Sequence, residues 1–270
     1  MGRPEANPGE GGDEVLADYY DSDYPSVLGG DPANWDDAST ALGLATDVSF
    51  YAGLRPGARV LEVGAGTGRI TEGLLAVGCE VHAVEPSRAM RARLRARAER
   101  AAFGEALTIH TSVRTAPAGL DLAVLGFGVL ACLPSEAEQL SLLQSVRSRL
   151  RSGGLLALDD PTEAGSDMPG PTRETPTWIR THVDRGTRYV RLAARSTPTA
   201  AGAVVAGRYR EAQRPDVPFT LRLRLSSSQV KARLIAQAGF RDVCTANGPD
   251  APPMPGARTF ALATVEEVGE

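Results

Sequence analysis

The sequence predicts an α/β fold, in which a doubly wound and mostly parallel sheet of seven strands is interrupted by a small antiparallel β insertion. Two observations predict it. Between residues 58 and 161, short apolar runs of strand length alternate with longer segments whose apolar residues recur every three to four positions. Beyond a stretch rich in Pro, Gly, Thr and acidic residues, strand-like runs then follow one another without helical periodicity.

The first strand, Ala58–Val63, leads into a glycine-rich turn and a helix that ends near Gly78. Ser87 can cap the second helix, and the capping box Ser135-Glu136-Ala137-Glu138 opens the third. A second capping box at 226–229 opens the last helix. The other strands of the sheet are expected at 80–85, 106–111, 122–127, 155–158, 240–245 and 258–265, and those of the insertion at 187–194, 203–211 and 219–225.

Composition and charge narrow the class of protein. A formal net charge of -4 argues against a nucleic-acid or anionic-membrane partner, and the most apolar stretch, 122–134, is too short to span a bilayer. The three cysteines, Cys79, Cys132 and Cys244, are far apart, so the sequence implies neither a disulfide framework nor a metal site. We therefore expect a cytoplasmic protein, and the sequence leaves its oligomeric state open.

The glycine-rich turn lies in the stretch LEVGAGTGRIT, residues 61–71. The turn does not match the dinucleotide fingerprint G-x-G-x-x-G, because Arg69 stands where the third glycine is required. It does not match the phosphate-loop motif G-x-x-x-x-G-K-[ST] either, because no Lys follows these glycines. The pattern that fits is E-x-G-x-G-x-G, from Glu62 to Gly68. Glycine at alternate positions lets the backbone turn sharply and lie close to a ligand.

This pattern resembles motif I of class I methyltransferases that depend on S-adenosyl-L-methionine (SAM). Glu85, in Val84-Glu85-Pro86-Ser87, ends the second strand where that family places an acid for the ribose hydroxyls. Residues 122–134 resemble the family's fourth strand and following loop, and 151–154 resemble its glycine turn before strand five. The resemblance covers roughly residues 40–160 and the C-terminal strands, and it implies a Rossmann-like methyltransferase fold.

The antiparallel insertion is similar to that of sugar and amino-acid N-methyltransferases from bacterial natural-product pathways. The resemblance thus implies SAM-dependent methyl transfer to a nitrogen, oxygen or electron-rich carbon of a small molecule in secondary metabolism. We expect a disordered tail at 1–14, an N-terminal lid at 15–52, a SAM-binding core at 53–160, a substrate-capping insertion at 161–225 and the C-terminal part of the core at 226–270.

The resemblance also implies a set of cofactor contacts. Glu62 would hold the ammonium end of SAM, Glu85 the ribose, and the helix that starts near Gly68 would direct N–H groups at the carboxylate. Ser112 stands where many relatives have an acid for the adenine, so its hydroxyl, the Val113 N–H or His110 takes that place. The expected cofactor-binding residues are Tyr20, Glu62, Gly64, Ala65, Gly66, Gly68, Glu85, Pro86, Met90, Ser112, Val113 and Phe127.

The N-terminal segment is rich in aromatic residues. Of the 14 in the chain, six lie between positions 19 and 51: Tyr19, Tyr20, Tyr24, Trp35, Phe50 and Tyr51. The segment Asp18-Tyr19-Tyr20-Asp21 resembles the Tyr-Asp lid of small-molecule methyltransferases. These rings either gate the cofactor or only pack the lid onto the core.

Candidate catalytic residues lie where the substrate would enter. An amine acceptor needs only its neutral form, whereas a hydroxyl needs a base. We expect Asp160 and His182 as candidate bases, with Asp159 and Asp160 facing the substrate at the end of strand five. Tyr24 is expected among the catalytic residues as a ring near the reaction centre. His82, inside strand two, is expected in the core.

Two other functions fit parts of the sequence. A non-catalytic SAM-binding regulator would keep Glu62–Gly68 but would not need the aromatic lid and the insertion. An NAD(P)-dependent oxidoreductase conflicts with Arg69 in the fingerprint.

Overall fold

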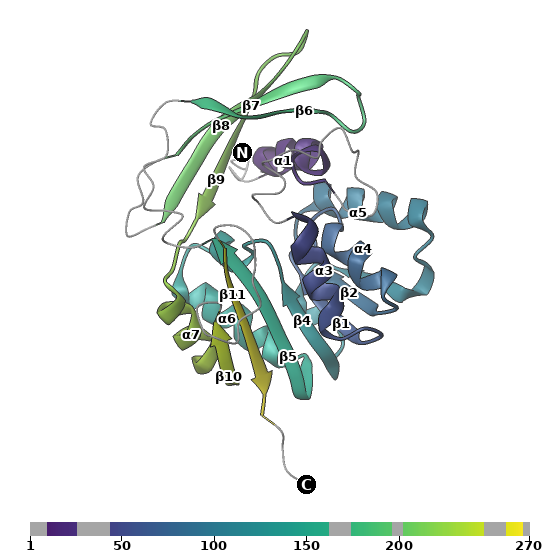
Figure 1. Cartoon of the computed structure of the whole chain (residues 1–270), viewed down its shortest axis with the longest axis vertical. Coiled ribbons are helices and arrows are strands. Elements are labelled where there is room, and N and C mark those ends of the chain that lie inside the picture. Colours follow the sequence, from purple (N-terminus) through teal and green to yellow (C-terminus); the bar gives the residue numbers. More distant parts are fainter. Residues whose placement is uncertain (1–9, 26–43, 162–173, 196–201, 246–257, 267–270) are drawn as a thin grey trace, which may run out of the picture.

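The main sheet has seven strands in the order β10-β11-β5-β4-β1-β2-β3. In the computed structural model, which describes residues 10–25, 44–161, 174–195, 202–245 and 258–266, the strands from β1 to β5 are parallel. Strand β11 is antiparallel to both of its neighbours, β5 and β10. This architecture confirms the predicted α/β fold (Figure 1).

The bounds of the elements follow the predicted alternation. The strands of the main sheet are β1 (Arg59–Val63), β2 (Glu80–Val84), β3 (Leu107–His110), β4 (Leu120–Leu125), β5 (Leu150–Pro161), β10 (Phe240–Thr245) and β11 (Arg258–Val265). The helices are α1 (Glu10–Asp23), α3 (Leu44–Leu54), α4 (Arg69–Ala76), α5 (Arg88–Ala101), α6 (Glu136–Arg147) and α7 (Ser228–Gln237). Short 3₁₀ helices are η2 (Gly104–Ala106), η3 (Val113–Thr115) and η4 (Leu130–Cys132).

Serine caps begin three of the helices. The side chains of Ser87, Ser135 and Ser227 each accept a hydrogen bond from the backbone N–H three residues later. The first two caps are those that the sequence predicts, whereas the cap of α7 lies one residue inside the predicted box. Strand β5 begins at Leu150, so the predicted glycine turn at 151–154 lies within its first residues.

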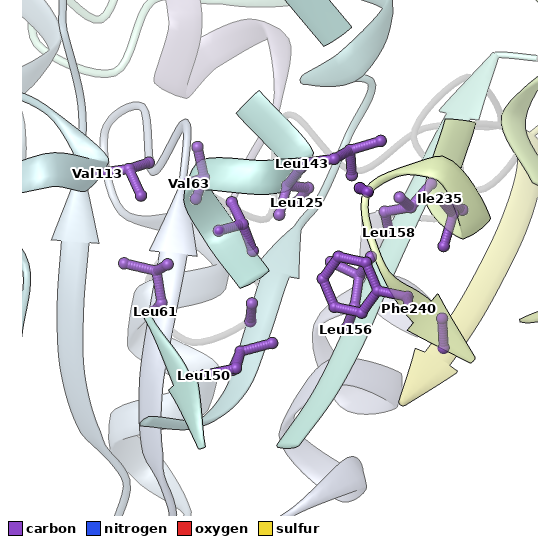
Figure 2. Packing of buried hydrophobic residues seen from close by; sticks show 14 of the residues in the cluster. Leu61, Val63, Val113, Leu125, Leu143, Leu150, Leu156, Leu158, Ile235 and Phe240 are labelled. Carbon is purple, nitrogen blue, oxygen red and sulfur yellow. The ribbon is translucent and has the colours of Figure 1, made fainter. Parts of the chain in front are cut away.

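Both faces of the main sheet are covered by apolar side chains. On one face, Leu61, Leu125 and Leu156 pack with Ile235 of α7 and Phe240 of β10 (Figure 2). The opposite face carries a second cluster, which includes residues of α3 and α4: Val48, Tyr51, Val60, Ile70, Leu74, Val81, Leu122 and Val124. Strand β4 contributes to both clusters, as its continuous apolar run predicts.

The insertion forms a separate antiparallel sheet in the order β6-β7-β8-β9. Its strands are β6 (Thr175–Thr181), β7 (Arg188–Arg195), β8 (Ala203–Glu211) and β9 (Val217–Leu223). The sequence predicts only the last three of these strands. Helix α1 lies between this sheet and the main domain (Figure 1), with Tyr19 of α1 in the same apolar cluster as Trp178, Tyr189 and Tyr209.

The predicted N-terminal boundaries need correction. Helix α1 begins at Glu10, so residues 10–14 are helical rather than part of a disordered tail. The predicted lid, residues 15–52, contains parts of two separate helices, α1 and α3. Helix α3 belongs to the main domain, where its Tyr51 is fully buried in the core. Trp35 lies outside the described residues. Among the residues described, no helix has both the length and the apolar character required to cross a membrane.

Candidate active site

The glycine-rich turn after β1 depends on its glycines. Gly64, Gly66 and Gly68 all have positive φ angles, of 70°, 58° and 97°. A Cβ on Gly64 would lie 2.4 Å from Val129 Cγ2, and one on Gly68 would lie 2.5 Å from Leu94 Cδ1. At Gly66 the nearest atoms belong to the ring of Tyr20, 3.5 Å from the added Cβ. The fold therefore brings Tyr20 of α1 directly against the turn.

Glu85 lies beside the same turn, immediately after β2. Its two carboxylate oxygens accept hydrogen bonds from the N–H groups of Gly66 at 2.8 Å and Ser87 at 2.7 Å. The backbone N–H of Glu85 donates to the carbonyl of His110 at 3.0 Å. These bonds hold the Glu85 carboxylate beside the turn, and a carboxylate oxygen can accept more than one hydrogen bond.

Glu62 lies inside β1, where it is only 2% exposed. One of its oxygens accepts a hydrogen bond from the Thr71 hydroxyl at 2.6 Å. Burial raises the pKa of Glu62 to about 8, although the Thr71 hydrogen bond opposes this effect. A cation bound nearby would stabilise the ionised form, so the acid suits an ammonium group.

The other predicted cofactor residues lie at the ends of neighbouring strands. Ser112 caps η3 after β3, with its hydroxyl accepting from the Arg114 N–H at 3.3 Å, and Val113 is buried. Met90 lies in the first turn of α5. Phe127 follows β4 in a left-handed conformation, with φ of 61°. The carboxyl edge of a parallel sheet is where such folds bind ligands.

Aromatic rings join this edge to α1. The ring centroid of Tyr24 lies 4.8 Å from that of Tyr20 and 4.8 Å from that of Phe127. Trp178 of β6 lies 6.2 Å from Tyr24 on the side of the insertion. Burial raises the pKa of Tyr24, so its hydroxyl keeps its proton at neutral pH. Tyr24 therefore presents an aromatic ring and a protonated hydroxyl beside the glycine turn, and its catalytic role stays a prediction.

The two carboxyl groups at the end of β5 are enclosed, which corrects the expectation that they face the substrate. Asp159 is fully buried and accepts hydrogen bonds from the Tyr51 hydroxyl at 2.5 Å and the Phe127 N–H at 2.9 Å. Asp160, 1% exposed, accepts from the Ala131 N–H at 3.1 Å and lies 3.8 Å from the Lys231 ammonium of α7. Burial raises the pKa of Asp160 to about 7.

His182 is fully buried at the start of the turn between β6 and β7. Its Nδ1 accepts a hydrogen bond from the Asp184 N–H at 3.2 Å, so the neutral ring carries its proton on Nε2. That nitrogen lies 3.6 Å from a carboxylate oxygen of Asp18, beyond hydrogen-bond distance. Asp18, His182 and Asp184 have the spacing of metal ligands, but neither ring nitrogen has a lone pair left for a metal. The ring packs against Tyr19, at 5.2 Å between centroids.

A buried cluster around Asp23 was not anticipated from the sequence. The Asp23 carboxylate accepts hydrogen bonds from Trp178 at 2.8 Å and from the hydroxyls of Tyr189 and Tyr209 at 2.6 Å each. Arg191 lies 3.7 Å from the same carboxylate. The cluster attaches the end of α1 to the insertion. No local pattern marks Asp23 among the neighbouring aspartates, because its partners follow more than 150 residues later.

Comparison with known proteins identifies the central part of the chain. Residues 61–156, which include the glycine turn and Glu85, match the family described as a methyltransferase domain. This match confirms the resemblance drawn from Glu62–Gly68 and the prediction of a methyltransferase enzyme, and it supports SAM as the cofactor. No curated protein sequence matches the chain.

Solved structures share the fold around this methyltransferase domain. The CcbJ methyltransferase from Streptomyces caelestis is 23% identical, with a TM-score of 0.71 over 95% of this chain and 98% of that one. An amino pentose methyltransferase of calicheamicin biosynthesis from Micromonospora echinaspora is 18% identical, with a TM-score of 0.63 over 86% and 93%. A sugar N-methyltransferase from a Streptoalloteichus species is 20% identical, with a TM-score of 0.63 over 86% and 89%.

Proposed function

We propose that this methyltransferase uses SAM to methylate an amine nitrogen of a small molecule in secondary metabolism. The observation that carries the proposal is the position of Gly66. Its N–H donates to Glu85 at 2.8 Å, and the Tyr20 ring covers its other side. The glycine motif, the acid after the second strand and the N-terminal helix thus meet at one point, although they come from three separate parts of the sequence.

The residues at this point fit the cofactor. Glu85 would accept hydrogen bonds from the ribose hydroxyls, and the buried carboxyl of Glu62 would pair with the ammonium group. The turn lies at the N-terminus of α4, whose N–H groups favour a carboxylate. SAM, when bound, supplies a methyl group on a sulfonium that is activated for in-line transfer. Tyr20 and Tyr24 would exclude water and place π-faces near the positive charge.

The protonation and the partners of the three candidate catalytic residues favour an amine as the acceptor. Tyr24 keeps its proton, Asp160 is paired with Lys231, and His182 is fully buried with its Nδ1 already accepting the Asp184 N–H. None of the three is placed to take a proton from a hydroxyl, whereas a neutral amine can attack without a base. Two of the similar structures are an amino pentose methyltransferase and a sugar N-methyltransferase. Holding the amine in line would then provide most of the rate acceleration.

Titration calorimetry tests the cofactor, and matched substrate pairs test the acceptor atom. Binding of SAM and of S-adenosylhomocysteine (SAH), without binding of NAD, is expected. Tight NAD binding without SAM binding would instead identify an oxidoreductase.

The substrate panel consists of amino sugars, each paired with the analogue in which a hydroxyl replaces the amine. We expect SAH formation with an amine and not with its hydroxyl analogue. Faster turnover of the hydroxyl analogue would assign an oxygen acceptor. SAM binding without turnover on any member of a broad amine panel would favour the non-catalytic regulator.

A further inference from the structure

Two histidines on adjacent strands face each other beside the proposed cofactor site. His82 Nδ1 on β2 lies 3.2 Å from His110 Nε2 on β3, aligned as a hydrogen bond. The outer nitrogens are also engaged. His82 Nε2 lies 3.0 Å from a Glu80 oxygen, and His110 Nδ1 lies 3.3 Å from the Thr115 hydroxyl. A chain of four side chains therefore runs from the start of β2 to η3.

The outer partners fix where two protons lie. The Thr115 hydroxyl donates its single proton to the carbonyl of Ser112 at 2.8 Å, so it can only accept from His110. His110 Nδ1 therefore carries a proton. The ionised carboxylate of Glu80, which is 3.5 Å from the guanidinium of Arg59, likewise only accepts, so His82 Nε2 carries a proton.

These assignments leave a conflict between the facing nitrogens. If both rings were neutral, His82 Nδ1 and His110 Nε2 would each present a lone pair to the other at 3.2 Å. Two nitrogens at this distance and alignment require a proton between them.

We infer that His82 and His110 share one proton at neutral pH, and that this proton positions Glu85 and the turn at 112–115 for cofactor binding, an inference that rests on the proposed function. The Glu80 carboxylate lies 3.0 Å from His82 Nε2 and stabilises a positive charge on that ring, which places the shared proton on His82. The pair is thus a positively charged ring that donates to a neutral one.

His110 connects the pair to both cofactor elements. Its backbone carbonyl accepts the N–H of Glu85 at 3.0 Å, and its ring bonds Thr115, which in turn holds the carbonyl of Ser112. Loss of the proton would set two lone pairs against each other and turn the His110 ring away. Glu80, Arg59 and Thr115 are the recorded groups around the pair. The contribution of the pair to cofactor affinity should therefore be lost when the shared proton leaves.

The protonation state can be read without cofactor, because the chain has only three histidines. Long-range nitrogen–proton spectra near pH 7, with His182→Gln to assign the third ring, should show His82 protonated on both nitrogens and His110 on Nδ1 alone. As pH rises, the backbone amides of Glu85 and Thr115 should shift with the same midpoint as the rings. Two neutral rings at pH 7, or amides that do not follow the rings, would overturn the inference.

A matched pair of variants tests the effect on the cofactor. His82→Asn places an amide N–H at the position of Nδ1 and can donate at every pH, whereas His82→Leu cannot donate. Between about pH 6.5 and 9, the SAH affinity of the natural protein should fall about fivefold more than that of His82→Asn. A fivefold change corresponds to the loss of one hydrogen bond of about 1 kcal/mol. His82→Leu should bind weakly throughout.

Parallel pH profiles for the natural protein and His82→Asn would overturn the role of the pair in positioning. Absence of SAH binding at every pH would instead refute the proposed function, and the ring and amide spectra would still decide whether the pair shares a proton and moves the turn.

Discussion

Asp21 of α1 accepts a hydrogen bond from the Thr67 hydroxyl at 2.5 Å, which joins the N-terminal helix to the middle of the glycine turn. Arg97 of α5 donates to the same carboxylate oxygen at 2.5 Å and to Glu72 of α4 at 2.8 Å. Tyr20, the neighbour of Asp21, covers Gly66. The helix cannot leave the domain without breaking these contacts, so its position and the conformation of the turn are coupled.

Thr67→Val tests this coupling, because it removes the hydroxyl and nearly preserves the shape. We expect the docking of α1 to weaken by about 1.5–3 kcal/mol, the range for a hydrogen bond to a charged group. Amides between residues 15 and 24 should lose protection in hydrogen exchange, and SAH should restore part of it. Thr108→Val, an exposed position on β3, is the control. Unchanged protection in Thr67→Val would show that the other contacts of α1, such as the ion pair between Arg97 and Asp21, hold the helix without the Thr67 hydroxyl.

Glu85→Ala should damage both the cofactor site and the turn. Loss of the carboxylate should weaken SAH binding by about 1.5–3 kcal/mol. Because the same oxygens accept the N–H groups of Gly66 and Ser87, the melting temperature should also fall. Calorimetry and thermal melting measure the two effects, with the exposed Glu99→Ala of α5 as control. A folded Glu85→Ala variant of unchanged affinity would remove Glu85 from the ribose site.

The fold could be predicted because its signals are local. Apolar spacing marks each strand and helix over a few residues, and the serines at 87 and 135 cap helices through bonds to N–H groups three residues later. Strand β6 was missed because Thr175–Thr181 follows directly on a Pro- and Gly-rich stretch, and several of its residues are exposed. Its large side chains Trp178 and Arg180 are buried by contact with distant parts of the chain.

In the candidate site, too, the sequence locates residues that belong to local motifs but not those that distant contacts bring together. Glu62 and Glu85 belong to short motifs, so the sequence locates them. His82 and His110 are 28 positions apart, and only the register of β2 and β3 makes them neighbours. At the end of β5, successive side chains point to opposite faces. Asp159 therefore bonds Tyr51 of α3, while Asp160 faces Lys231 of α7, and no local pattern in the sequence reveals either partner.

Binding of SAM should release a proton from Glu62. Burial raises the pKa of this carboxyl to about 8 in the free protein, and a bound ammonium group would lower it. Below about pH 8, the acid would therefore bind a proton before the cofactor arrives and lose it afterwards, so this carboxyl makes affinity increase with pH up to that point. Calorimetry in buffers of different ionisation enthalpy counts the protons.

The matched control for this measurement is Glu62→Gln, which keeps the shape and cannot titrate. The amino group of SAM titrates in both proteins, so the difference between their proton counts isolates Glu62. We expect that difference to shrink as pH rises beyond about 8. Equal counts in the two proteins at every pH would mean that Glu62 does not respond to the cofactor.

Lys231 of α7 and Asp160 of β5 form a buried pair whose charges depend on each other. The ammonium lies 3.8 Å from the carboxylate, and both side chains are about 2% exposed or less. The folded pKa of Asp160, about 7, exceeds the unfolded value of about 3.9. This carboxyl therefore contributes its full stability at low pH, and the contribution is lost as pH rises through about 7.

Lys231→Met should make this loss steeper, because it leaves the carboxylate without its cation. At about pH 8 we expect the free energy of unfolding to fall by about 3–5 kcal/mol, the range for breaking a buried ion pair. Near pH 5 the loss should be smaller, because Asp160 can take up a proton and become neutral. Chemical denaturation at the two pH values measures the effect. Adding Asp160→Asn to Lys231→Met removes the buried charge and should recover most of the stability at pH 8. An equal loss in Lys231→Met at both pH values would show that the packing of the lysine stem, rather than its charge, stabilises this part of the fold.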